Sequence, residues 1–167
     1  MRSTGMNGPL VNIVLIQPEI PQNTGNIARL SLCTRSRLYL VGKLAFSLEE
    51  KQVRRAGLDY WDRVDLVVEP DLGAFLDRLE PERTFLFTRH AGRSFHEVGY
   101  PPVPFLLFGC ETKGLPEVVR ARFPNREVAI PQSPAARCLN LSNAVAVAVY
   151  QVLGANAGFS SLMQADR

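Results

Sequence analysis

Short runs of apolar residues alternate along the chain with segments whose apolar residues recur every three or four positions. Residues 11–16 hold five apolar side chains in six, many of them branched, which is typical of a buried strand. Residues 24–35 carry an apolar stripe at helical spacing, with Asn23 or Thr24 as the candidate N-cap. The chain therefore begins with a strand, a loop and a helix.

The same two periods predict the remaining elements. Strands are expected at residues 37–41, 65–69, 83–88, 105–108 and 127–130. Helices are expected at residues 71–79 with Asp71 as cap, at 115–122 with Pro116 in the first turn, and at 143–153. A capping box, Ser47-Leu-Glu-Glu50, predicts a further short basic helix that ends near Gly57.

The last of these helices is ambiguous by period alone. Residues 144–149 alternate Ala and Val, which fits a strand. A helix is favoured because Asn140, Ser142 and Asn143 are cap candidates and because the apolar run continues to Leu153. The small alanine side chains would let another backbone approach this helix closely.

The order of elements is β-α-β-α-β-α-β-β-α-β-α, which predicts an α/β fold with a mostly parallel sheet and helices on both faces. One domain is expected over residues 11–155, after a disordered extension at 1–10 and before a tail at 156–167. The N-terminal extension lacks the apolar core of a signal peptide, and the apolar runs fall short of a membrane span. We therefore expect no membrane association.

Charge is unevenly spread along an otherwise ordinary composition of 46% hydrophobic and 21% charged residues. The segment from Arg29 to Arg63 holds eight basic and four acidic residues, whereas the rest holds eleven and twelve. Sixteen of the nineteen basic residues are arginine, whose planar guanidinium suits phosphate. RNA or another polyanion and a merely solvated basic face explain this charge equally well.

Cysteine and histidine usage argues against disulfides and metals. Cys33, Cys110 and Cys138 are odd in number and widely spaced, which fits a reducing cytoplasm. The two histidines and the lack of Cys-x-x-Cys or His-x-x-x-His spacing predict no metal site. No serine-hydrolase or zinc-protease motif is present.

Two loops that follow predicted strands carry candidate chemistry. In Asn23-Thr-Gly-Asn-Ile-Ala-Arg29, Asn26 and Arg29 share one helix face, so they can hold a ribose hydroxyl and its phosphate. A capped helix with a solvated arginine is the plainer interpretation. In Phe108-Gly-Cys-Glu-Thr-Lys-Gly-Leu115, two glycines let the backbone approach a ligand closely. Glu111 either accepts hydrogen bonds from that ligand or simply braces an ordinary turn.

A third stretch, residues 128–150, consists of a strand end, a loop with almost no charge and a tight helix. Open α/β sheets build ligand sites in this way, and such a loop suits a neutral or zwitterionic ligand. The default interpretation of Asn140, Ser142 and Asn143 is that they only cap the helix.

Together the three stretches resemble the three motifs of the SpoU-type branch of the SPOUT RNA methyltransferases. These motifs are N-x-x-N-x-x-R, F-G-x-E-x-x-G-L and I-P-x(n)-S-L/M-N-L-S-N-A-V, and they occur here in order, each after a predicted strand. Residues 18–26 and 54–60 further resemble the small TrmL-like tRNA wobble-nucleotide 2′-O-methyltransferases, which consist of the catalytic domain alone. The resemblance runs from about residue 11 to residue 153.

The resemblance implies a C-terminal deep trefoil knot, an exception to the rule against knots. It implies S-adenosylmethionine as methyl donor, bound in the knot, and no metal. It also implies a cytoplasmic homodimer that acts on the anticodon stem-loop of tRNA. The expected substrate is the ribose 2′-hydroxyl of the wobble nucleotide, cytidine or carboxymethylaminomethyl-uridine, in leucine tRNAs.

Residue by residue, the resemblance implies three groups. Catalytic residues are Arg29, the catalytic arginine of the family, and Asn26. Cofactor-binding residues are Phe87, Thr88, Gly109, Glu111, Gly114, Ile130, Cys138, Leu139 and Asn140. RNA-binding candidates are Lys51, Arg54, Arg55 and Arg137, with Arg35 and Arg37 as further possibilities. The chain departs from the family in Cys138, which replaces the usual Ser, and in Gln151, which replaces a frequent Glu.

Two other functions remain open. A 2′-O-methyltransferase for another tRNA or rRNA ribose would use the same motifs, although the lack of an added RNA-binding domain weighs against it. A module that only binds an adenosine ligand or tRNA would need neither Asn26 nor Arg29, so their presence favours an enzyme.

Overall fold

A computed structural model describes residues 8–48 and 61–163 of the 167-residue chain. In these residues the strands are β1 (Val11–Ile16), β2 (Ser36–Val41), β3 (Leu66–Glu69), β4 (Thr84–Phe87), β5 (Phe105–Phe108) and β6 (Glu127–Val128). They form one sheet in the order β3-β2-β1-β5-β4-β6, and each of its pairings is parallel. The predicted α/β class and mostly parallel sheet are confirmed.

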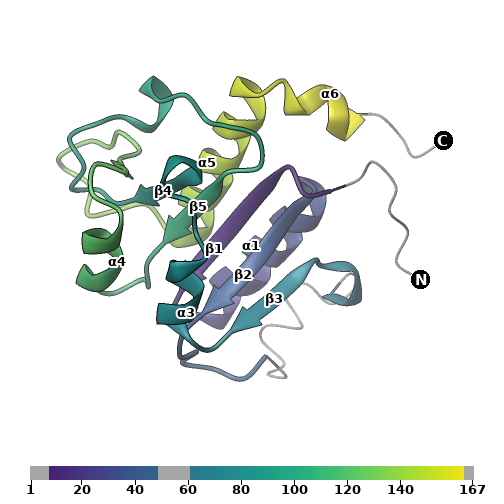
Figure 1. The fold of residues 1–167 in the computed structure, drawn as a ribbon, viewed down its shortest axis with the longest axis horizontal. Helices are drawn as coiled ribbons and strands as arrows, with labels where there is room; N and C mark the ends of the chain where they lie inside the picture. Colours follow the sequence, from purple (N-terminus) through teal and green to yellow (C-terminus); the bar gives the residue numbers. More distant parts are fainter. Residues whose placement is uncertain (1–7, 49–60, 164–167) are drawn as a thin grey trace.

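Helices cover both faces of the sheet (Figure 1). The α-helices of the described residues are α1 (Pro21–Cys33), α3 (Leu72–Asp77), α4 (Glu117–Arg122), α5 (Leu141–Ala155) and α6 (Gly158–Met163). Short 3-10 helices occur at Trp61–Arg63, Pro81–Arg83 and Phe95–Glu97. Figure 1 shows α1 and α5 behind the sheet and α3 in front of it. In this part of the chain, no helix combines the length and apolar character that a membrane crossing requires.

The central strand β1 explains why both faces need helices. All six of its residues are buried. Ile13 and Leu15 pack in the cluster shared with α1 and α5, whereas Val14 and Ile16 pack in the cluster shared with α3 and α4. A strand that is covered on both faces has a nearly continuous run of apolar residues, as β1 does.

Predictions of the helix caps are confirmed where a residue next to the helix supplies the cap. Asp71 caps α3 by accepting a hydrogen bond from the Ala74 N–H (3.0 Å). Asn140 caps α5, which is a helix as predicted and not a strand. Pro116 is the N-cap residue of α4, so it lies just before the helix and not in its first turn as predicted. The helix predicted from the Ser47 capping box falls on residues 49–57, outside the described residues.

Most element ends are shifted by one or two residues from prediction, and three differences affect the site or the C-terminal segment. Helix α1 begins at Pro21, and its N-cap residue is Ile20, so neither Asn23 nor Thr24 caps it. Strand β6 ends at Val128, beyond which a single parallel bridge joins Ala129 to Ser94. Helix α6 lies within the segment that was expected to be a tail.

Candidate functional site

A cavity of about 720 Å³ opens at the carboxyl ends of β4 and β5. The loops after these strands line it, together with the start of α1 and the segment before α5. The strand order reverses its direction between β1 and β5, and open parallel sheets bind ligands at such a switch point. The cavity therefore lies where the fold favours a ligand.

The three motif stretches meet at this cavity. All nine predicted cofactor-binding residues line it: Phe87, Thr88, Gly109, Glu111, Gly114, Ile130, Cys138, Leu139 and Asn140. Asn23 from the first stretch and Arg137 from the third also line it. Asn26 and Arg29 do not, because they lie on the exposed face of α1.

Stacked aromatic rings form one wall of the cavity. Phe87 ends β4 and Phe108 ends β5, and their ring centroids lie 4.8 Å apart with an interplanar angle of 20°. Phe95 packs against Phe87 at 6.4 Å in an edge-on arrangement. All three side chains are almost fully buried, so this wall is rigid and apolar.

The loop after β5 is folded too tightly for a side chain at its first glycine. A Cβ placed on Gly109 would lie 1.9 Å from the carbonyl carbon of Gly114 and 2.1 Å from the amide nitrogen of Leu115. Gly114 has a φ of +71°, and its N–H donates to the carbonyl oxygen of Cys110 (2.9 Å). Glycine at both ends of this loop therefore allows the close backbone turn that borders the cavity.

Glu111 braces this loop against the start of α1. Its carboxylate accepts hydrogen bonds from the backbone N–H groups of Glu19 (2.8 Å) and Ile20 (3.2 Å) and from Nδ2 of Asn23 (2.9 Å). A carboxylate at a helix N-terminus also stabilises the helix dipole. Of the two roles predicted for Glu111, bracing is the one its contacts show, and it explains why α1 has no side-chain cap of its own.

Asn23 extends this network to the third stretch. Its Oδ1 accepts a hydrogen bond from Nδ2 of Asn140 (3.0 Å), and Oδ1 of Asn140 accepts from the N–H groups of Ser142 (2.9 Å) and Asn143 (3.4 Å). Asn23 is only 4% exposed, so these bonds satisfy a buried amide. The three motifs are thus joined in one continuous hydrogen-bond network.

A second carboxylate, that of Glu19, also joins the loops after β1 and β5. Glu19 accepts hydrogen bonds from the backbone N–H (3.1 Å) and the Oγ1 hydroxyl (2.8 Å) of Thr112. The loops after β1 and β5 therefore exchange carboxylate contacts, because Glu111 binds at Glu19 in return. No local sequence signal predicts this role for Glu19 or Thr112, since the two residues lie 93 positions apart.

The segment over residues 131–140 is exposed throughout, yet two hydrogen bonds fix it. Oε1 of Gln132 accepts from the Leu139 N–H (2.9 Å), and Nη1 of Arg89 donates to the carbonyl oxygen of Arg137 (2.7 Å).

Arg120, on the cavity wall, donates to Glu127 (2.6 Å), and this hydrogen bond raises the pKa of Arg120. Four basic side chains and one acidic side chain, Glu111, line the cavity.

The remaining predicted residues lie elsewhere. Lys51, Arg54 and Arg55 are outside the described residues. Arg37 forms an ion pair with Asp65 (2.8 Å), and Arg35 donates to the carbonyl oxygen of Ser161 (3.0 Å). Residues 8–48 and 61–163 contain no group of three or more potential metal-binding side chains.

Replacing Glu111 with glutamine is expected to lower the free energy of unfolding by about 2 kcal/mol, because the amide accepts fewer of the three hydrogen bonds and leaves the buried Asn23 amide poorly paired. Urea unfolding followed by circular dichroism measures this change. The matched control is Glu97→Gln, at an exposed position that ends the 3-10 helix Phe95–Glu97. An equal loss in both variants would contradict the bracing role.

Comparison with known proteins identifies close relatives over most of the chain. A family model described as the SpoU rRNA Methylase family matches residues 10–150. A tRNA (cytidine(34)-2′-O)-methyltransferase of Burkholderia ambifaria is 43% identical over 145 residues, which cover 85% of this chain and 93% of that protein.

Solved structures share the fold. A structure described as giving insights into the 2-OH methylation of C/U34 on tRNA has a TM-score of 0.82 and 42% identity, covering 89% of this chain and 97% of that one. The SpoU methyltransferase AviRb from Streptomyces viridochromogenes, solved with the cofactor AdoMet, has a TM-score of 0.79 at 21% identity and covers 92% and 60%.

Proposed function

The chain belongs to the SpoU methylase family, and we propose that it transfers a methyl group from S-adenosylmethionine to the ribose 2′-hydroxyl of the wobble nucleotide of tRNA. The observation that carries this proposal is the convergence of the three motif stretches on one cavity. Relatives of similar length that are more than 40% identical to this chain are named tRNA (cytidine(34)-2′-O)-methyltransferases. Cytidine or modified uridine at position 34 of leucine tRNAs is the specific substrate that the family resemblance favours.

The residues around the cavity suit S-adenosylmethionine. A volume of about 720 Å³ falls in the range of small-molecule sites. The buried wall of Phe87 and Phe108 offers an apolar surface to a flat base, and the close turn at Gly109 and Gly114 brings backbone groups to the ligand. The residues proposed to hold it are the nine that line the cavity: Phe87, Thr88, Gly109, Glu111, Gly114, Ile130, Cys138, Leu139 and Asn140.

The bound cofactor supplies a methyl group on a positively charged sulfur. The chain must hold the ribose oxygen in line with that methyl group, so that the oxygen–methyl bond would form as the sulfur–methyl bond breaks and the hydroxyl proton would pass to solvent. Positioning alone accounts for much of such an acceleration. Arg29 stays protonated, so it does not act as a base. We assign it the stabilisation of negative charge on the 2′-oxygen and the orientation of the adjacent phosphate. Asn26, one turn earlier on the same face, positions the ribose.

A homodimer is part of this proposal. Val147 is 43% exposed and Tyr150 47% exposed on α5, and the ring of Phe159 on α6 lies 6.1 Å from that of Tyr150. Exposed apolar side chains that gather on one face mark association surfaces. Helix α5 packs beside α1, so a second copy docked there would also lie close to the face that carries Asn26 and Arg29.

Tyr150→Lys is expected to convert the dimer into a monomer, because a charged side chain would be buried in an apolar interface. Multi-angle light scattering measures the mass. Val118→Lys is the control, since Val118 is 59% exposed on α4. A variant at Tyr150 that keeps the wild-type mass would contradict the assignment of this face.

The trefoil knot and the cytoplasmic location are also proposed. The route of α5 supports the knot, because α5 follows the edge strand β6 yet packs against α1 and the central strand β1. The free state of Cys33, Cys110 and Cys138 supports a reducing compartment.

Incubation of the purified protein with methyl-labelled S-adenosylmethionine and total tRNA tests the function. Methylation is expected at the wobble ribose and is expected to disappear on a stem-loop that carries 2′-deoxyribose at that position. Methylation of rRNA or of another tRNA ribose would support the first alternative. Binding without any methyl transfer would support a binding module.

A further inference from the structure

A second cavity of about 380 Å³ adjoins the first. The segment after β4, residues 89–94, forms one side, and the segment after β6, residues 129–137, forms the other. Arg89, Ile130, Gln132 and Arg137 line both cavities, so the two spaces share a wall. A ligand group in the second cavity would therefore lie directly beside a ligand in the first.

Three arginines, Arg89, Arg93 and Arg137, line the second cavity, and its lining includes no Asp or Glu. Among the described residues, the ion pairs involve none of the three. All three side chains are exposed; Arg89 and Arg93 belong to the segment after β4, and Arg137 belongs to the segment after β6. The cavity therefore concentrates positive charge that the surrounding residues do not neutralise.

Backbone contacts hold the two sides of this cavity together. Nη1 of Arg89 donates to the carbonyl oxygen of Arg137 (2.7 Å), and the Ala129 N–H donates to the carbonyl oxygen of Arg93 (2.9 Å). A parallel bridge joins Ser94 to Ala129. The arginines are thus presented on connected segments, so a ligand need not order the loops before it binds.

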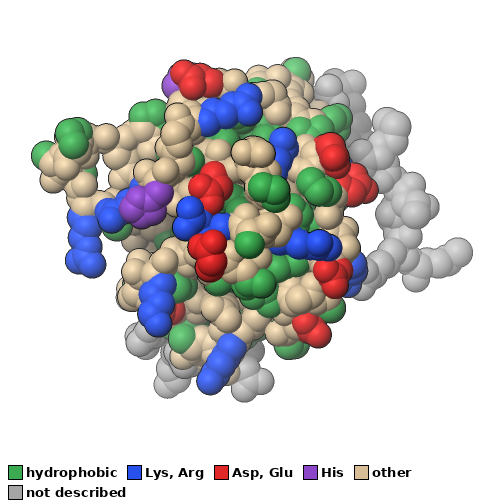
Figure 2. Space-filling view, turned by 60° about the vertical axis from the view of Figure 1, so that its left-hand side comes forward, with side chains coloured by type: hydrophobic (Ala, Val, Ile, Leu, Met, Phe, Trp, Pro, Cys, Tyr) green, Lys and Arg blue, Asp and Glu red, His purple; other side chains and the backbone are tan. Residues whose placement is uncertain are grey.

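The electrostatics near the cavity favour an anion. Burial lowers the pKa of Arg126, the carboxylate of Glu82 raises it, and the positive charge of Arg93 lowers it, so the charge of Arg93 acts on its surroundings. Guanidinium groups bind phosphate through two parallel hydrogen bonds, which makes clustered arginines suited to a nucleic-acid backbone. Figure 2 shows the side of the molecule that comes forward from the left of Figure 1, where blue Lys or Arg and purple His side chains lie together at the left margin.

We propose that the cavity formed by Arg89, Arg93 and Arg137 binds a backbone phosphate of the RNA strand that delivers the ribose to the adjoining cavity. This inference rests on the proposed function and adds a contact that positions the strand. The carboxylate of the methyl donor is a weaker match, because one carboxylate occupies a single bidentate arginine and Lys113 and Arg120 already line its own cavity.

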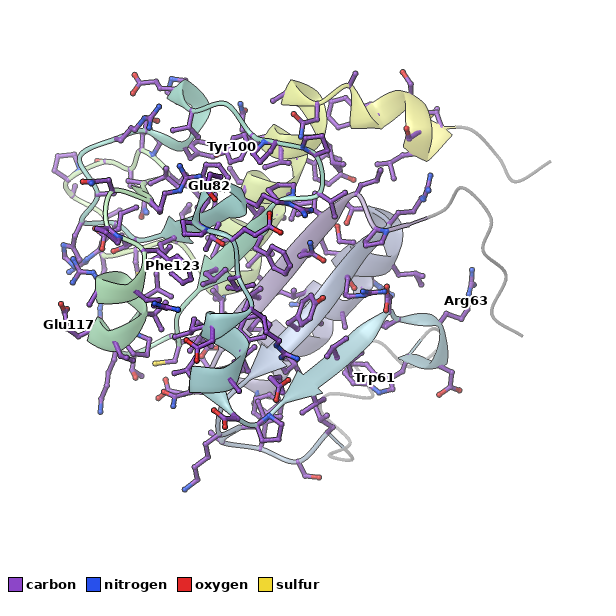
Figure 3. All side chains as sticks on the ribbon, viewed as in Figure 1. Trp61, Arg63, Glu82, Tyr100, Glu117 and Phe123 are labelled. Carbon is purple, nitrogen blue, oxygen red and sulfur yellow. The ribbon has the colours of Figure 1, made fainter. Side chains whose placement is uncertain are left out.

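Arg63, the described end of the predicted basic segment, lies at the opposite edge of the sheet from this contact. Figure 3 shows Trp61 and Arg63 beside β3, far from Tyr100 and from Phe123 at the end of α4. Strand β3 forms one edge of the sheet, whereas β4 and β6 lie at the other.

The test compares Arg93→Ala, Arg93→Lys and the control Arg122→Ala, an exposed arginine on α4 that pairs only with Asp77. Binding of tRNA is followed by fluorescence anisotropy at several salt concentrations, binding of S-adenosylmethionine by calorimetry, and methyl transfer by label incorporation. For Arg93→Ala we expect tRNA affinity to fall about fivefold and the slope of log affinity against log salt to become shallower by about 0.7 to 0.9. Arg93→Lys should retain most of the slope, and cofactor affinity should stay unchanged.

Two results would overturn the inference. One is a salt slope and tRNA affinity for Arg93→Ala equal to those of Arg122→Ala, while the wild type still methylates tRNA, which leaves the proposed function intact. The other is a loss of cofactor affinity in Arg93→Ala, which would assign the cavity to the methyl donor. If Arg93 contributes to tRNA binding but the wild type transfers no methyl group, the phosphate contact stands and the proposed function fails.

Discussion

Replacing Arg29 with lysine is expected to lower kcat by at least about 100-fold, a typical cost of removing one donor that stabilises developing negative charge. Lysine keeps the charge but loses the planar pair of donors that can hold an oxygen and a phosphate together. The affinity for S-adenosylmethionine should stay within about twofold of the wild-type value. The reason is that Arg29 lies on the exposed face of α1 and does not line the cofactor cavity.

Single-turnover methyl transfer and calorimetry on the same preparation separate these two effects. Arg63→Lys is the matched control, because it makes the same replacement at an exposed position beside β3 (Figure 3). Near-normal turnover in Arg29→Lys would rule out the proposed role. A large loss of cofactor affinity would instead place Arg29 in the cofactor site.

The hydrogen-bond network explains how a residue outside the cavity can be positioned for chemistry inside it. Glu111 and Asn140 hold Asn23 in the first turns of α1, and both belong to the cavity wall. Arg29 lies six residues further along, about 9 Å along the helix axis. Helix α1 is rigid and is held at its start by the loops that line the cofactor cavity. The position of those loops therefore also fixes the position of Arg29, which we assign to the RNA.

The parts of the fold that the sequence predicted best depend on local burial. Strand β1 has the predicted bounds because it is covered on both faces, and α5 is a helix because Asn140 caps it locally. The start of α1 could not be predicted in the same way. Its N–H groups bind Glu111, and that residue lies 92 positions away from Glu19, so no rule based on neighbouring residues applies.

The candidate site likewise contains residues that the sequence predicted and residues that only the folded chain brings together. The resemblance to a family predicted nine residues that do line one cavity, whereas periodicity alone left Glu111 with two possible roles. Glu19 and Thr112 meet only after β1 and β5 pair. Arg89 and Arg93 lie in no recognised motif, and they face Arg137 only because the segments after β4 and β6 lie side by side.

Gly109→Ala is expected to lower the free energy of unfolding by at least about 3 kcal/mol, the upper range for overpacking a tightly packed position. The new Cβ would lie 1.9 Å from the carbonyl carbon of Gly114, 2.2 Å from its oxygen and 2.1 Å from the amide nitrogen of Leu115. All three are backbone atoms, so no side-chain rotation can relieve the contact. The loop after β5 would have to move away from the cavity.

The same movement should remove cofactor binding, because Glu111 and Gly114 lie in the displaced loop and line the cavity. Chemical unfolding and calorimetry with S-adenosylmethionine measure the two effects. Gly99→Ala is the control, since a Cβ there meets no atom within 4 Å and should leave both quantities unchanged. A Gly109→Ala variant with wild-type stability would show that this loop can shift at little cost. If such a variant still lost the cofactor, the close turn would be required by the ligand and not by the fold.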